Sequence, residues 1–210
     1  MTRTADRIRP PPAPDSVLSS VRVVLYEPQD PVNIAATIRA MKNMGCSNLY
    51  LVRSVEYDPW RLEGIAHDTG DVIEKIMNCD TIEEALEGCV HVAGFTARRR
   101  AAKRDVTTPR SASGEMLEFA RTGPVALLFG REDKGLPNEI LDRAHVVVTI
   151  PTTEHASLNL AQAVLIALYE LHLSAADATR NLAPPRKDSP PATAEEYEKL
   201  FADVERGLYA

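Results

Sequence analysis

The chain has little cysteine and no long apolar run. Its three cysteines are Cys46, Cys79 and Cys89. They form neither a Cys-x-x-Cys pair nor a cysteine–histidine set at zinc-finger spacing, so we expect buried free thiols and no metal site. No stretch of about 18 apolar residues is present to cross a membrane, and the N-terminal residues lack the apolar core of a signal peptide. These absences predict a soluble, cytoplasmic protein.

Several common catalytic motifs are also missing. There is no G-x-x-x-x-G-K-[ST] and no G-x-G-x-x-G, which excludes ATP and nicotinamide enzymes of those types. His155 has neither a Ser-x-Gly elbow nor a paired acid to form a hydrolase triad, so we expect it to be a loop histidine. The net charge of −6 argues against a protein that coats nucleic acid indiscriminately.

Positive charge is nevertheless concentrated in one short stretch. Its basic residues are Arg98, Arg99, Arg100, Lys103 and Arg104. A run of this kind is more often a solvated loop than a phosphate-binding site. A surface for an RNA backbone is the alternative that the composition leaves open.

The length and composition predict one domain with tails. With 210 residues and 44% apolar content, the chain can bury one sizeable core. We expect four parts: a flexible Pro-rich arm at 1–16, an α/β domain at 17–175, a linker at 176–192 and an amphipathic helix at 193–210. Thr193 and Glu196 form a capping box for that last helix. A lone helix of this length is marginal, so we expect it to pack on the domain, on a second copy or on a further domain.

Between the tails, apolar strand patterns alternate with helical ones. The predicted strands are 21–26, 49–53, 90–95, 125–129 and 146–150, and the predicted helices are 31–44, 59–66, 82–87, 114–120, a turn after Pro137 and a long helix beginning near Ser157. This alternation predicts a parallel α/β sheet with helices on its faces. Open sheets of this kind bind ligands at the carboxyl ends of their strands.

Three stretches at such positions carry polar residues. They are NIAATIRAMKNMG at 33–45, LLFGREDKGL at 127–136 and IPTTEHASLNLAQAV at 150–164. Each stretch has an ordinary structural explanation. Asn33 would lie in the first turn of a helix and Arg39 on its surface, and Glu132 would be a carboxylate in a turn. Ser157 would be the N-cap of the last helix, with Asn159 in its first turn. The alternative is that these stretches hold a ligand.

Taken together, in this order and strand context, the three stretches resemble the motifs of the SPOUT RNA ribose 2′-O-methyltransferases, specifically the TrmH/TrmJ branch. The resemblance covers residues 21–173. It implies a parallel α/β sheet with a C-terminal deep trefoil knot. It also implies a homodimer that binds S-adenosylmethionine in the knot. Neither a metal ion nor a membrane is expected as a partner.

The resemblance assigns site residues to positions of this sequence. The implied cofactor-binding residues are Phe95, Thr96, Ala97, Gly130, Ile150, Ala156, Ser157 and Leu158. The implied catalytic residues are Asn33, Arg39, Glu132, Ser157 and Asn159. A ribose hydroxyl is a weak nucleophile near neutral pH and needs orientation and a proton acceptor. We expect the Arg39 guanidinium to clamp an RNA phosphate and polarise that hydroxyl, because it is always charged and presents a rigid donor fork.

Within the branch, the first motif, the strand at 49–53 and the basic run at 98–104 are most similar to the TrmJ-like members. These methylate cytidine or uridine at nucleotide 32 of the tRNA anticodon loop. The resemblance thus implies a tRNA-backbone surface at the basic run and Arg39. An rRNA 2′-O-methyltransferase and a non-catalytic RNA-binding or assembly factor remain alternatives. TrmJ-like proteins have a longer C-terminal helical extension, so we expect the last helix to be its beginning or a reduced tail.

Overall fold

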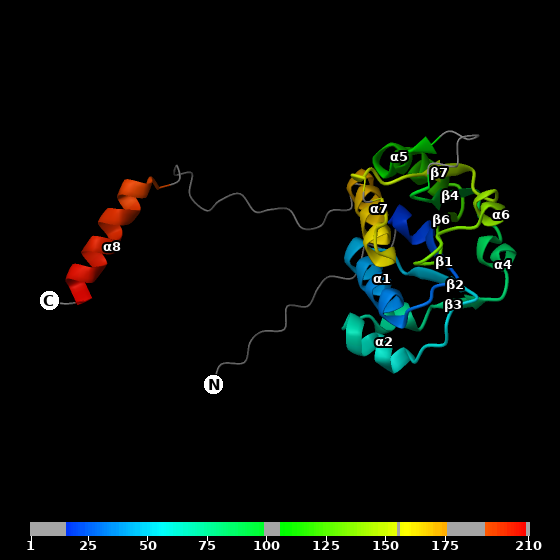
Figure 1. The fold of residues 1–210 in the computed structure, drawn as a ribbon, viewed down its shortest axis with the longest axis horizontal. Coiled ribbons are helices and arrows are strands. Elements are labelled where there is room, and N and C mark those ends of the chain that lie inside the picture. Colours follow the sequence, from blue (N-terminus) through cyan, green and yellow to red (C-terminus); the bar gives the residue numbers. More distant parts are fainter. Residues whose placement is uncertain (1–15, 99–105, 155, 176–191, 209–210) are drawn as a thin grey trace. The chain divides into compact units, whose positions relative to one another are not determined.

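A computed structural model describes residues 16–98, 106–154, 156–175 and 192–208. The chain separates into two units, Met1–Ala178 and Thr179–Ala210. In the first unit, strands and helices alternate around one sheet (Figure 1). The described residues of the second unit, 192–208, contain the helix α8 (Ala194–Leu208).

The described sheet has seven strands, all parallel, in the order β3-β2-β1-β6-β4-β7-β5. The strands are β1 Val21–Tyr26, β2 Asn48–Val52, β3 Met77–Cys79, β4 His91–Phe95, β5 Val106–Thr107, β6 Val125–Phe129 and β7 Val146–Val148. The predicted parallel α/β class is confirmed. The strands β6, β4 and β7 are consecutive neighbours in this order. Because all strands are parallel, the loops that follow these three strands lie together at one edge of the sheet.

Helices cover both faces of the sheet (Figure 1). They are η1 Val17–Ser20, α1 Pro31–Met44, α2 Pro59–Ala66, α3 Gly70–Ile73, α4 Ile82–Leu86, α5 Pro109–Ala120, α6 Asn138–Leu141 and α7 Leu160–Ser174. Alternate β1 side chains enter different cores because successive strand residues point to opposite faces. Val23 and Leu25 pack in the core with α1, α2, α5 and α7, and Val24 packs with α4 and α6.

The helix α1 forms as its sequence predicts. The Asp30 side chain accepts a 2.8 Å hydrogen bond from the Val32 N–H, and Pro31 occupies the first turn, where it has no N–H to leave unsatisfied. Gly45 ends the helix with a φ of 80°, a left-handed conformation that favours glycine. The buried face of α1 packs against α7, so the first and third polar stretches are neighbours.

The predicted first residue of α7 was wrong. The strand β7 ends at Val148, and the helix begins at Leu160 instead of near Ser157. Asn159 is the N-cap, because its Oδ1 accepts hydrogen bonds from Ala161 N (2.9 Å) and Gln162 N (3.3 Å). Ser157 is therefore not the cap. It belongs to a connecting segment that follows the strand end.

Other differences concern short or capped elements. The helix predicted at 114–120 begins at Pro109, where the Thr108 hydroxyl accepts a hydrogen bond from Ser111 N. The strands β3 and β5 and the helix α3 were not predicted, because two to four residues are too few to show a periodic pattern.

The described cysteines are free thiols, as predicted, although their burial differs. Cys46 and Cys79 are buried and Cys89 is partly exposed. Burial raises the pKa of the Cys79 and Cys89 thiols. No helix among the described residues is both long and apolar enough to cross a membrane.

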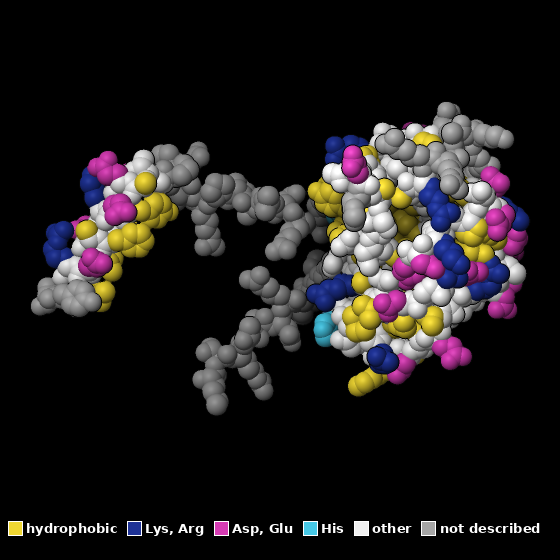
Figure 2. All heavy atoms as spheres, in the orientation of Figure 1, with side chains coloured by type: hydrophobic (Ala, Val, Ile, Leu, Met, Phe, Trp, Pro, Cys, Tyr) yellow, Lys and Arg dark blue, Asp and Glu magenta, His cyan; other side chains and the backbone are white. Residues whose placement is uncertain are grey.

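The helix α8 has the predicted capping box. Thr193 N donates to Glu196 Oε2 at 2.7 Å, and Glu196 N donates to Thr193 Oγ1 at 3.3 Å. Hydrophobic side chains lie along one side of the helix (Figure 2). These exposed side chains are Tyr197, Leu200, Phe201, Val204 and Leu208. Residues 1–15 of the predicted arm at 1–16 and residues 176–191 of the predicted linker at 176–192 lie outside the described residues.

Candidate cofactor pocket and active site

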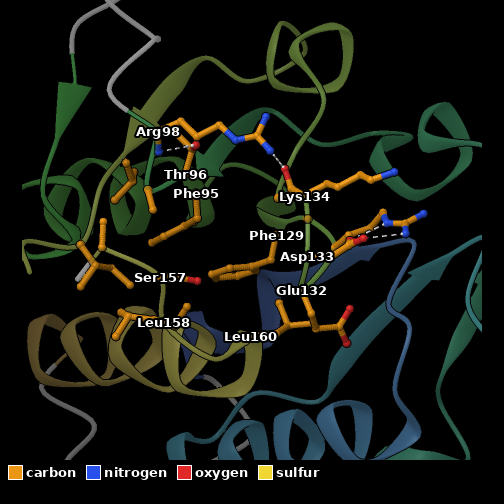
Figure 3. A pocket seen from close by; sticks show the side chains of 18 residues that line it. Phe95, Thr96, Arg98, Phe129, Glu132, Asp133, Lys134, Ser157, Leu158 and Leu160 are labelled. Atoms are coloured by element: carbon orange, nitrogen blue, oxygen red, sulfur yellow. Dashed lines mark hydrogen bonds and ion pairs between the residues drawn. The ribbon is translucent and has the colours of Figure 1, made fainter. Parts of the chain in front are cut away.

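A cavity of about 340 Å³ lies at the carboxyl ends of β4, β6 and β7 (Figure 3). Its walls are the residues after β4, the turn after β6 and the segment between β7 and α7. All eight residues that the sequence resemblance assigned to the cofactor line this one cavity: Phe95, Thr96, Ala97, Gly130, Ile150, Ala156, Ser157 and Leu158. The parallel sheet brings together residues that are more than 60 positions apart.

One wall of the cavity is aromatic. The rings of Phe95 and Phe129 stack with their centroids 4.5 Å apart, and Leu158 and Leu160 lie nearby (Figure 3). Flat apolar surfaces of this kind suit a planar ring system. Phe129 was not among the predicted site residues. Its position as the last residue of a strand, directly before Gly130, is the sequence signal that could have indicated it.

The turn after β6 depends on glycine. A Cβ placed on Gly130 would lie 2.2 Å from both the Gly135 carbonyl carbon and the Leu136 nitrogen. The turn closes through a 2.8 Å hydrogen bond from Gly135 N to Arg131 O, and Gly135 has a φ of 62°. Only glycine permits the backbone to fold back this closely, which leaves the cavity wall at this point formed by main chain.

The segment after β7 is fixed to the residues after β4. Thr96 N donates to Val148 O at 3.0 Å, and the Thr149 hydroxyl donates to Thr96 O at 2.9 Å. These bonds extend the β4–β7 pairing beyond the strand ends. Two of the three cavity walls are therefore held in register by main-chain and hydroxyl hydrogen bonds.

The Glu132 carboxylate binds the start of α1. It accepts hydrogen bonds from Gln29 N (2.9 Å), Asp30 N (3.3 Å) and Asn33 Nδ2 (2.9 Å). Because its oxygens already accept three N–H groups, Glu132 is placed to position α1 and is poorly suited to remove a proton from a substrate. It also lines the cavity (Figure 3).

A second hydrogen bond continues this connection to α7. Asn33 Oδ1 accepts from Asn159 Nδ2 at 2.8 Å, and Asn159 in turn caps α7. Three of the five predicted catalytic residues, Asn33, Glu132 and Asn159, thus form one network that joins α1, the turn after β6 and the start of α7. Sequence spacing could not show this network, because its members are 27 to 126 residues apart.

The remaining predicted residues are distributed differently. Ser157 lines the cavity. Arg39 is exposed on α1 and is not among the residues that line the cavity. Arg98 lines the cavity and donates to the carbonyl oxygen of Lys134. The other predicted RNA-binding residues and His155 lie outside the described residues; these are Arg99, Arg100, Lys103 and Arg104.

An ion-pair cluster that was not predicted includes two residues of the cavity lining, Arg131 and Asp133. Arg131 forms two hydrogen bonds with Asp133 (2.9 and 3.1 Å) and one with Glu27 (3.4 Å). These contacts hold the pKa of Asp133 below its usual value, chiefly through the hydrogen bonds to Arg131. Glu27 also pairs with Arg53 at 2.8 Å. Lysine, arginine and acidic side chains lie close together on this face (Figure 2).

The comparison with known proteins agrees with this arrangement. Residues 20–169 match the SpoU rRNA Methylase family. The chain belongs to this family. The match spans every element from β1 through most of α7, and it therefore includes all three walls of the cavity. Membership makes this protein an RNA methyltransferase.

Three relatives illustrate the match. The tRNA (cytidine/uridine-2′-O-)-methyltransferase TrmJ of Sodalis glossinidius (strain morsitans) is 37% identical over 193 residues, which cover 91% of this chain and 76% of that protein. The crystal structure of TrmJ from Z. mobilis ZM4 is 31% identical with a TM-score of 0.68, covering 88% of this chain and 78% of that one. The AdoMet-bound rRNA methyltransferase from Sinorhizobium meliloti is 29% identical with a TM-score of 0.56, covering 73% and 56%.

Proposed function

We propose that this SpoU-family protein is a tRNA ribose 2′-O-methyltransferase that uses S-adenosylmethionine and acts on cytidine or uridine 32 of the anticodon loop, in the cytoplasm. The main support for this proposal is that the eight residues assigned to the cofactor line one cavity although they are far apart in sequence. The similarity to TrmJ over 91% of the chain supports tRNA as the substrate class.

The cavity fits the cofactor in size and chemistry. Its volume lies in the usual range for small-molecule sites, about 300–1,000 Å³. The stacked rings of Phe95 and Phe129 offer an apolar surface for adenine, and the Gly130 turn exposes main-chain groups to its polar edge. When bound, S-adenosylmethionine supplies an electrophilic methyl group on a sulfonium. The protein's own contribution is to bind the cofactor, exclude water and orient the ribose.

We assign the network residues to positioning. The Asn33 side chain donates a hydrogen bond to Glu132 and accepts one from Asn159. These bonds hold the start of α1 next to the cavity. Arg39 clamps an RNA phosphate and orients the ribose hydroxyl toward the methyl group that bound S-adenosylmethionine would supply. The hydroxyl proton passes to the neighbouring phosphate. Such orientation can lower a barrier by roughly 7–11 kcal/mol.

Because Arg39 is not among the residues that line the cavity, we propose that a second copy of the chain supplies it. An apolar stripe on α7 supports a homodimer. Leu165, Tyr169 and Leu173 recur at i, i+4 and i+8 and are 39%, 47% and 45% exposed, although α7 packs against α1 on its other side. Val32 on α1 is also exposed.

Complementation tests this arrangement directly. Arg39→Ala and Gly130→Val, each inactive alone, are unfolded and refolded together. If Arg39 acts across the dimer, activity returns to about a quarter of wild type, because half of randomly paired dimers are mixed and each has one complete site. If Arg39 acts within its own chain, the mixture stays inactive.

The substrate is tested with labelled S-adenosylmethionine, total tRNA and ribosomal RNA, followed by mapping of the labelled nucleotide. We expect label in the ribose of nucleotide 32 of tRNA. Label only in rRNA would establish the rRNA alternative. Binding of RNA without binding of cofactor at high micromolar concentration would establish the non-catalytic alternative.

We also propose that the chain is knotted. The strand β7 pairs with β4 on one side and β5 on the other, so it enters the sheet between two strands that precede it in the sequence. This order supports a threaded connection, which is rare among folds. A crystal structure that traces residues 95–160 without a break tests the proposal. It fails if the chain, drawn taut from both ends, becomes a straight line.

A further inference from the structure

Arg98 joins two walls of the cavity. Its backbone N–H donates to Thr96 Oγ1 at 3.1 Å, which turns the chain just after β4. Its side chain then extends to the opposite wall, where a guanidinium nitrogen donates to the carbonyl oxygen of Lys134 (Figure 3). The sequence placed Arg98 in an RNA-binding run, but the structure places its side chain at the cavity.

Some of the charged side chains around the cavity have an oppositely charged partner and others do not. The Arg131 guanidinium is occupied by Asp133 and Glu27. The Glu132 carboxylate accepts three N–H groups. Arg98 and Lys134 are the cationic lining residues for which no carboxylate partner is present among the described residues. The acidic lining residues are therefore paired within the protein, whereas the Arg98 guanidinium contacts, among the described residues, only a carbonyl oxygen, that of Lys134.

The proposed cofactor has one group that needs this charge. Its adenosine is matched by rings and main-chain groups, but its amino-acid end carries a carboxylate. A guanidinium binds a carboxylate strongly, because its planar fork can donate two parallel hydrogen bonds. The contact with Lys134 O uses one of the two terminal nitrogens. The remaining N–H donors of the guanidinium stay available for a carboxylate.

We propose that Arg98 binds the carboxylate of the cofactor's amino-acid part and, through Lys134 O, holds the turn after β6 closed over it. This inference rests on the proposed function. It assigns Arg98 to the cofactor instead of to the RNA backbone. It also gives the pocket a means of selecting intact cofactor over nucleosides that lack the amino-acid part.

Two ligands separate this contact from the rest of the pocket. S-adenosylhomocysteine has the carboxylate, and 5′-methylthioadenosine has the same adenosine and thioether without it. Calorimetry is done on the full chain with wild type, Arg98→Ala, Arg98→Lys and the control Arg110→Ala. Arg110 is an exposed arginine that pairs with Glu170 and does not line the cavity. Thermal unfolding verifies that each variant is folded.

We expect Arg98→Ala to weaken S-adenosylhomocysteine about 10- to 100-fold, the usual effect of losing a charged hydrogen bond. Binding of 5′-methylthioadenosine stays unchanged, Arg98→Lys recovers part of the loss, and Arg110→Ala matches wild type for both ligands.

Three results overturn the inference while leaving the proposed function intact. The first is unchanged binding of S-adenosylhomocysteine by Arg98→Ala. The second is an equal loss for both ligands, which would give Arg98 a role in pocket shape alone. The third is a loss of tRNA affinity with cofactor affinity unchanged, which would return Arg98 to the RNA surface. Failure of wild type to bind either ligand overturns the proposed function as well.

Discussion

The two ends of the parallel strands use their polar residues in different ways. At the carboxyl ends, Glu132, Asn33 and Asn159 connect separate loops by hydrogen bonds and leave a cavity beside them. At the amino ends, side chains from different elements contact one another. His91 at the start of β4 stacks on Phe119 and His145, with ring centroids 4.4 and 5.1 Å apart.

The amino end also has a partly buried arginine that contacts other elements. Arg22, near the start of β1, donates to the carbonyl oxygens of Ala85 (3.2 Å) and Glu87 (2.8 Å) and lies over the Tyr50 ring. These hydrogen bonds provide donors for carbonyl oxygens at the end of α4. The comparison teaches that carboxyl-end polar residues shape a site, whereas amino-end residues contribute mainly to stability. Substitutions at the two ends should therefore separate activity from stability.

The largest expected effect is at Gly130. In Gly130→Ala the added Cβ meets the main chain of residues 135 and 136, so the turn must open. We expect loss of detectable binding of S-adenosylhomocysteine by calorimetry and a destabilisation of about 2 kcal/mol or more. The control is Gly114→Ala, an exposed helix position where a Cβ meets nothing within 4 Å. It should stabilise the protein by about 0.5–1 kcal/mol. Normal cofactor binding by Gly130→Ala would contradict the proposed wall.

Next comes Glu132→Gln, which replaces one acceptor oxygen by an amide that cannot accept N–H groups. The start of α1 loses charged hydrogen bonds worth about 1.5–3 kcal/mol each, and tRNA methylation should fall at least about tenfold. The matched control Glu139→Gln, on the exposed first turn of α6, should retain wild-type kcat. A variant that is destabilised but fully active would show that the network only supports the fold.

At the amino end, Arg22→Met removes the donors to α4 but keeps a long apolar side chain. We expect the free energy of unfolding in urea to fall by about 1–3 kcal/mol, with kcat and KM unchanged. Arg61→Met, at an exposed position on α2, should leave both stability and activity unaltered. A reduced kcat for Arg22→Met in the folded state would break the distinction between the two ends.

The smallest effect concerns pH. Burial lowers the pKa of His91, a shift that His145 reinforces and Glu115 opposes. Its Nε2 has no hydrogen-bond partner among the described residues. Since the unfolded state binds the proton more tightly, stability is complete above the ordinary histidine pKa of about 6.5 and falls as the pH drops below it.

In His91→Phe this part of the pH dependence between pH 7 and 5 should disappear from thermal unfolding curves. The control His67→Asn replaces an exposed histidine that has a φ of 47°, a conformation that asparagine tolerates. It should keep the wild-type slope. An unchanged slope in His91→Phe would show that other groups control acid sensitivity.

Local patterns in the sequence predicted most of the fold. The caps at Asp30 and Thr193 and the stop at Gly45 are set by neighbouring residues, and each is where the sequence placed it. The predicted start of α7 was wrong, because Ser157 and Asn159 are both good N-cap residue types and only the structure shows that Asn159 accepts the first-turn N–H groups. Short elements such as β5 depend on pairing with a neighbouring strand, which periodicity does not show.

The sequence by itself determined the alternation of strands and helices, the parallel sheet and the three polar stretches at the strand and helix ends, because caps, apolar periodicity and turn residues act over a few positions. The tertiary structure decided which residues meet. It showed that Glu132 is committed to α1, that Arg39 is exposed away from the cavity lining and that Arg98 reaches the cavity. These facts depend on contacts across the sheet, where sequence separation carries no information about distance.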